Sequence, residues 1–194
     1  MARTNNPKYI VVHHTGGTNA DPLADTSHHT RDTIRNWHVN GLGWTDIGYH
    51  WVIEKTGKTV AGRPEHLRGA HCRAVNSTSI GVCVTGNFDS TMPTNEQVQA
   101  LGTLLCDLME KYDIPINKIK PHRFWDIKTC YGNKLSDKWA QDVARLELEK
   151  RNKTNTENKE TEKTPSKELP STPKVSNSTF QNFIKLLMSF LSKK

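Results

Sequence analysis

The sequence has few cysteines, and their spacing does not suggest a structural role for them. Only four occur in 194 residues, at positions 72, 83, 106 and 130, and none forms a C-x-x-C pair. Paired short spacings of that kind are typical of structural zinc sites, which the sequence therefore does not predict. We expect no disulfide framework, in keeping with a reducing compartment.

Long apolar runs are also missing. The N-terminus, MARTNNPKYIVVHHT, contains no apolar run of signal-peptide length, and no segment is long enough to span a membrane. We therefore expect the protein to be made and kept in a cytoplasm. Hydrophobic residues make up only 34% of the chain, which indicates that part of it does not contribute to a core.

The chain carries a formal net charge of +7, and this charge is unevenly distributed. Residues 1–151 hold 19 basic and 16 acidic residues, whereas residues 180–194 hold three lysines and no acidic residue. A basic excess favours polyanions such as nucleic acid, anionic lipid or an acidic cell wall. Because the first section is nearly balanced and has no aromatic-basic binding motif, nucleic acid is not an expected partner.

Pattern and composition divide the chain into three sections. Residues 1–151 interleave β-branched runs with amphipathic stretches, which predicts a mixed α/β fold with a central sheet covered by helices. The expected strands cover residues 9–13, 50–62 as a hairpin, 79–86 and 116–120. The expected helices cover residues 29–39, 95–112 with a Thr94/Gln97 capping box, and 137–150 with Ser136 as N-cap.

The last two sections differ from the first. Residues 152–179 contain no aromatic residue and are rich in Thr, Lys, Glu and Ser, which is typical of a flexible linker. Residues 180–194, FQNFIKLLMSFLSKK, have a wide apolar face and a narrow polar stripe. This pattern predicts a basic amphipathic helix that contacts a membrane or cell envelope, with docking on a partner or on a second copy as the alternatives.

Histidines gather at the ends of the expected strands. His14 ends the first strand, and His122 follows the fourth segment with Cys130 eight residues beyond it. Strand ends meet at one edge of a sheet, and two imidazoles with one thiolate are a reasonable catalytic zinc set with an open position for water. The spacing alone leaves open that Cys130 is an inert thiol and His122 a turn residue.

Four ordered blocks carry a family resemblance: YIVVHHT, GWTDIGYHWVI, GAHCRAVNSTSIGVCVTGNF and HRFWDIKTC. Together they resemble the zinc-dependent N-acetylmuramoyl-L-alanine amidases of the phage lysozyme type, which share their fold with the peptidoglycan recognition proteins. The resemblance covers residues from about 8 to 150. It implies a central mixed sheet flanked by helices, with one Zn²⁺ at the floor of a groove for peptidoglycan.

The resemblance also implies roles for individual residues. It places the metal ligands at His14, His122 and Cys130, with His13 pointing to the other face of the strand by alternation. It implies that Tyr49 orients the attacking water or shuttles its proton and that Lys128 stabilises the oxyanion. The residues that it places in the substrate groove are His71 and Asn76, and the sequence adds Trp44 on a glycine-rich loop.

One position departs from the family pattern. Many members have Cys-Pro-Gly where this chain has Cys130-Tyr131-Gly132, which we expect to alter the stiffness of the loop and not the ligand chemistry. The predicted function is hydrolysis of the amide between N-acetylmuramic acid and L-alanine, as a phage endolysin that acts on the wall after release. The alternatives are a bacterial autolytic or recycling amidase and a recognition protein without catalysis. The presence of Cys130 and Lys128 favours hydrolysis.

Overall fold

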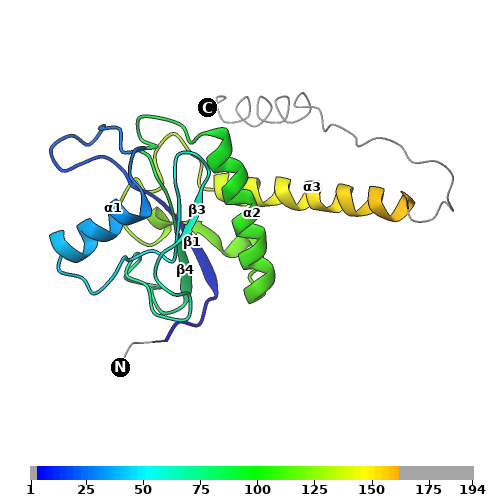
Figure 1. Ribbon diagram of the computed structural model, residues 1–194, viewed down its shortest axis with the longest axis horizontal. Helices are drawn as coiled ribbons and strands as arrows, with labels where there is room; N and C mark the ends of the chain where they lie inside the picture. The colour runs from blue at the N-terminus through cyan, green and yellow to red at the C-terminus, as the bar shows by residue number, and fades with distance from the viewer. Residues whose placement is uncertain (1–3, 162–194) are drawn as a thin grey trace. The chain divides into compact units, whose positions relative to one another are not determined.

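The computed structural model describes residues 4–161, and it shows a mixed β-sheet with helices packed against it (Figure 1). The five strands lie in the order β3-β2-β4-β1-β5. Their bounds are β1 Tyr9–His14, β2 Trp51–Ile53, β3 Thr59–Ala61, β4 Ser79–Val84 and β5 Ile119–Pro121. The predicted fold class is confirmed.

The centre of the sheet is parallel. β1 pairs in parallel with β4 over six residues on one side and with β5 over three residues on the other. β2 pairs in parallel with β4, and only β3 is antiparallel, as the second strand of the predicted hairpin. The residues of β4 are all buried, and those of β1 are buried from Ile10 on. Continuous apolar, β-branched runs are what strands covered on both faces require.

One helix begins where the sequence indicates, and another begins two residues later than predicted. The longest fully described one, α2, runs from Asn95 to Tyr112 and is capped by the predicted box, in which Thr94 and Gln97 exchange bonds with each other's backbone. Its leucines at 101, 104, 105 and 108 are buried. The short helix α1, Arg31–Asn36, continues into a π-helical turn, Trp37–Gly41, so that the predicted helix over 29–39 is present in two parts.

The last described helix runs past the predicted start of the linker. Helix α3 begins at Trp139 and continues to Thr161, well into the segment that was expected to be flexible from residue 152 on. Asparagine and threonine, which are weak helix formers, make up six of the ten residues 152–161, and lysine and glutamate make up the other four. Helix propensity therefore does not account for this extension. A compact unit ends at Glu147, and within it Trp139, Val143 and Ala144 are buried.

The predicted basic helix, residues 180–194, lies outside the described residues, as does most of the predicted linker. The contact that this helix was expected to make with a membrane or envelope therefore stays a prediction. Among the helices of residues 4–161, none combines the length and the apolar character needed to cross a membrane.

Candidate metal centre

Three potential metal ligands from distant parts of the sequence meet at one edge of the sheet. His13 lies near the end of β1, and His122 directly follows the neighbouring strand β5. With Cys130 they place one nitrogen or sulfur atom each within 4.8 Å of the others. The sulfur of Cys130 is 3.7 Å from Nδ1 of His13. Ligand atoms around a tetrahedral zinc ion stand roughly 3.3–3.8 Å apart. The donor set therefore fits zinc in kind, and the pair Cys130–His13 has the spacing of such a site.

The structure brings His13 to this cluster, in place of His14, which the sequence analysis gave as the ligand. Neighbouring residues of a strand point to opposite faces, and the ring of His14 lies beside that of Phe88, with centroids 5.8 Å apart. Its Nδ1 accepts a hydrogen bond of 3.0 Å from the backbone N–H of Phe88. The motif fits either histidine, since a polar residue follows both, and only the folded sheet decides which of the two faces the cluster.

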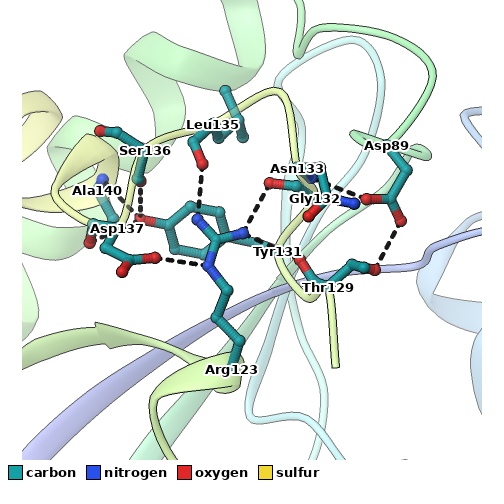
Figure 2. A network of polar contacts seen from close by, with 10 residues as sticks. All are labelled: Asp89, Arg123, Thr129, Tyr131, Gly132, Asn133, Leu135, Ser136, Asp137 and Ala140. Atoms are coloured by element: carbon teal, nitrogen blue, oxygen red, sulfur yellow. Dashed lines mark hydrogen bonds and ion pairs between the residues drawn. The ribbon is translucent and has the colours of Figure 1, made fainter. Parts of the chain in front are cut away.

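Arg123 holds the loop that carries Cys130, as Figure 2 shows. Its guanidinium donates to the carbonyl oxygens of Thr129, Gly132 and Leu135 at 2.6–3.0 Å, and it also pairs with Asp137. Its backbone N–H donates to the carbonyl of Cys130 itself at 2.8 Å. Arg123, which directly follows His122, therefore fixes the chain on both sides of Cys130. Sequence reasoning missed Arg123, because nothing in the spacing indicates which carbonyls it meets.

Tyr131 occupies the position where the family resemblance implies proline. Its ring is fully buried and lies edge-on to Trp139, with centroids 5.3 Å apart. Its hydroxyl lies 2.9 Å from the carbonyl oxygen of Ser136 and 3.1 Å from that of Asp137 (Figure 2). The loop after Cys130 is thus tied to the start of α3 by a buried side chain and its hydroxyl.

The electrostatics of the cluster favour neutral imidazoles. Burial lowers the pKa of His13 well below its ordinary value, and the neighbouring His71 and His122 lower it further. Burial also lowers the pKa of His122, with a second contribution from the charge of Lys128. Neutral imidazole is the form that binds a metal. Burial raises the pKa of the Cys130 thiol to about 12, whereas a bound cation deprotonates a coordinating thiol.

The two predicted catalytic residues lie beside the cluster. The ring centroid of Tyr49 is 5.1 Å from that of His13. Burial, together with the negative charge that Cys83 and Cys130 would carry as thiolates, raises the pKa of Tyr49, so its phenol stays protonated. Lys128 is half-exposed, and its ammonium lies 3.1 Å from the carboxylate of Asp126. The same carboxylate is 3.8 Å from Nε2 of His122, which places Lys128 at the outer side of the cluster.

The residues predicted to bind substrate lie in two different places. His71 and Asn76 are each 8% exposed and make internal contacts. The side-chain oxygen of Asn76 accepts from the backbone N–H groups of His71 and Cys72, at 2.8 Å each. Trp44 is 36% exposed and stacks on His38 with centroids 4.6 Å apart. Substrate binding by these three residues stays a prediction, and Trp44 is the most accessible of them.

Comparison with known proteins decides the family. The sequence matches the family described as N-acetylmuramoyl-L-alanine amidase over residues 3–133. The chain belongs to that amidase family. The endolysin of Escherichia phage T7 is 35% identical to it over 113 residues, which are 56% of this chain and 73% of the phage protein.

The amidase chain also has relatives of other kinds. Peptidoglycan-recognition protein SC2 of Drosophila melanogaster is 35% identical over 106 residues, covering 55% of this chain and 57% of the insect protein. Among solved structures, N-acetylmuramoyl-L-alanine amidase LysC from Clostridium intestinale URNW superposes with a TM-score of 0.58 at 36% identity. That match covers 66% of this chain and 78% of the clostridial one.

Proposed function

We propose that this protein is a zinc-dependent amidase that cuts peptidoglycan between N-acetylmuramic acid and L-alanine, and that it serves as a phage endolysin. The observation that supports this most directly is the convergence of His13, His122 and Cys130 beside Tyr49 and Lys128. A similar phage endolysin and a similar clostridial amidase support the assignment of the reaction.

The chemistry divides between the metal and the residues around it. A zinc ion on the three ligands would supply a Lewis acid for the scissile carbonyl and lower the pKa of a water. Hydrolysis adds the oxygen of water to the carbonyl carbon, breaks the C–N bond and delivers a proton to the departing L-alanine nitrogen. The residues of this chain must therefore stabilise an anionic oxygen and hold a proton.

Lys128 and Tyr49 are suited to these two tasks. The Lys128 ammonium lies on the solvent side of the ligands, where it can donate to the carbonyl oxygen as negative charge develops there. The phenol of Tyr49 remains protonated under all ordinary conditions, so it can hold the attacking water by a hydrogen bond or pass on a proton. Asp126, which pairs with Lys128, keeps the ammonium near His122.

Digestion of purified peptidoglycan with and without a chelator tests the reaction. We expect new L-alanine amino termini and free lactyl carboxyl groups on the muramic acid, and we expect the chelator to abolish both. New reducing sugar ends would instead identify a glycosidase. Sedimentation of the protein with intact wall fragments, without any cleavage, would support a recognition protein, for which the similarity to insect recognition proteins is the argument.

Two substitutions test the residue roles. Lys128→Ala and Tyr49→Phe should reduce turnover by about 100-fold or more while one zinc ion stays bound. Lys58→Ala at the exposed β2–β3 turn and Tyr112→Phe at the end of α2 are matched controls, and they should cleave as the wild type does. Full activity of both test variants would overturn the roles given to Lys128 and Tyr49.

A further inference from the structure

The ring of His13 has contacts at both nitrogens. Its Nδ1 faces the sulfur of Cys130 at 3.7 Å, and its Nε2 faces Nδ1 of His71 at 3.0 Å. A neutral imidazole carries one proton. For Nδ1 to present a lone pair to a metal ion, that proton must reside on Nε2, and Nε2 then needs an acceptor.

His71 can be that acceptor only in one tautomer, and its other contacts favour it. With Nδ1 accepting from His13, the proton of His71 resides on Nε2, which lies 3.4 Å from the hydroxyl oxygen of Ser79. This hydroxyl donates its own proton to the carbonyl of Val75 at 2.7 Å, so its lone pairs remain available. Each hydrogen bond from His13 through His71 and Ser79 to Val75 then has one donor and one acceptor. The carbonyl of Val75 can only accept, and this fixes the direction of all three bonds.

The fold holds the His71 ring closely. A Cβ atom added at Gly69 or at Gly81 would lie 2.5 Å from Cδ2 of His71, which is too close for any real side chain. The ring of His50 lies at right angles to it, with centroids 5.5 Å apart. Gly81 lies within β4, where glycine costs strand stability, so the space that it leaves for the ring is a packing reason for its presence.

We infer that His71 is a positioning residue, which fixes the tautomer and the ring orientation of His13 so that Nδ1 of His13 faces the metal. The inference rests on the proposed zinc centre. Both nitrogens of His71 are engaged by His13 and Ser79, so His71 is not itself a further ligand. Its small exposed fraction, 8%, also separates this role from the substrate contact predicted for it.

The zinc affinity of the chain should depend on the hydrogen-bond acceptor at position 71. Partners that orient a metal-bound histidine typically contribute about 10–100-fold to metal affinity, so His71→Ala should raise the zinc dissociation constant by that factor. His71→Asn places an amide oxygen where Nδ1 was, and it should restore affinity to within about threefold, because the acceptor is what matters. Ser79→Ala leaves His71 in place but removes the partner of its Nε2–H, and it should weaken binding by less than His71→Ala does.

The measurement is a competition titration of the full chain with a chromophoric zinc chelator at one neutral pH. The visible absorption spectrum of the cobalt-substituted protein is recorded in parallel, because it reports ligand geometry and not stability. His38→Asn is the matched control, since His38 is also buried and accepts a backbone N–H at Nδ1. It is none of the three cluster residues, and its ring neighbours Tyr49 and not His13. The zinc affinity and cobalt spectrum of His38→Asn should equal those of the wild type.

The outcomes separate the inference from the function on which it rests. Weak binding by His71→Ala with recovery in His71→Asn supports the positioning role. Wild-type affinity in His71→Ala, or equally poor binding in His71→Asn, overturns it while the zinc centre stands. A wild-type chain that binds no zinc overturns both. If His71→Ala does not fold, as its circular dichroism would show, the comparison of His71→Asn and Ser79→Ala with the wild type decides by the same criteria.

Discussion

Replacing each of the two adjacent histidines of β1 by asparagine should separate a metal ligand from a structural residue. At position 14 the amide oxygen of asparagine can take the place of Nδ1 and accept from the N–H of Phe88, now 3.0 Å away. That acceptor would otherwise be lost at a cost of about 1–3 kcal/mol. At position 13 the same change leaves an amide in a site that requires an imidazole nitrogen. His13→Asn and His14→Asn have the same amino-acid composition, and they differ only in which face of β1 carries the asparagine.

The expected size of the effect follows from linkage. Zinc at 100 times its dissociation constant stabilises the folded state by about 2.7 kcal/mol, which for a domain of this size corresponds to a rise in Tm of roughly 5–10 °C. Loss of a direct ligand should weaken binding by more than the about 100-fold that an outer partner contributes. At the same zinc concentration the stabilisation in His13→Asn then falls below about 0.4 kcal/mol, a shift of 2 °C or less.

Thermal denaturation with and without zinc measures both quantities in one experiment. His14→Asn should keep the zinc-induced shift of the wild type, whatever its own Tm is. His13→Asn should lose nearly all of the shift while its metal-free Tm stays within a few degrees. The opposite pattern, with the shift lost at position 14 and kept at position 13, would refute the assignment of His13 and restore His14 as the ligand.

Three further predictions concern the surroundings of the site. Arg123→Gln removes the guanidinium that donates to three carbonyls. It should lower the free energy of unfolding, measured by urea denaturation, by about 2–4 kcal/mol and reduce the zinc-induced rise in Tm. Arg73→Gln, at an exposed position, should change neither quantity. Gly81→Ala should destabilise the fold by about 1–3 kcal/mol through its clash with His71, and an unchanged Tm would contradict the tight fit. Burial lowers the pKa of His38 to about 4, so the unfolded chain takes up its proton first and stability falls as the pH drops from 6.5 to 4. His38→Asn should lose less stability over that range, and a pH dependence as steep as that of the wild type would argue against this.

Much of the sheet and of the main helix follows from the sequence. The run YIVVH is apolar and β-branched on both faces, so it indicates a strand inside a parallel sheet before any partner is known. In α2, leucines recur at three- and four-residue steps behind a capping box, and local and tertiary signals therefore agree. The proximity of His122 and Cys130 was also predictable, because one short loop carries both and the family blocks fix their order.

The remaining features depend on contacts that a single sequence does not encode visibly. Either His13 or His14 satisfies the motif, and the choice depends on how β1 is rotated when it pairs with β4 and β5. The contact between His71 and the ring of His13, 58 positions earlier in the chain, has no signal in the sequence. The extension of α3 to Thr161 was missed because residues 152–161 are rich in Asn and Thr, which favour helix only weakly.

The short pairing between β1 and β5 gives the metal a mechanical role. β5 is an edge strand held by only three register pairs, one of them to Pro121, whose backbone has no N–H to donate. A zinc ion bridging His13 to His122 and Cys130 would join this edge to the centre of the sheet across 117 positions of sequence. Metal binding would then hold β5 against β1. In the metal-free protein, β5 should separate from the sheet before the other strands do. Amide hydrogen exchange around residues 119–130 would slow on addition of zinc, while exchange in β4 stays the same.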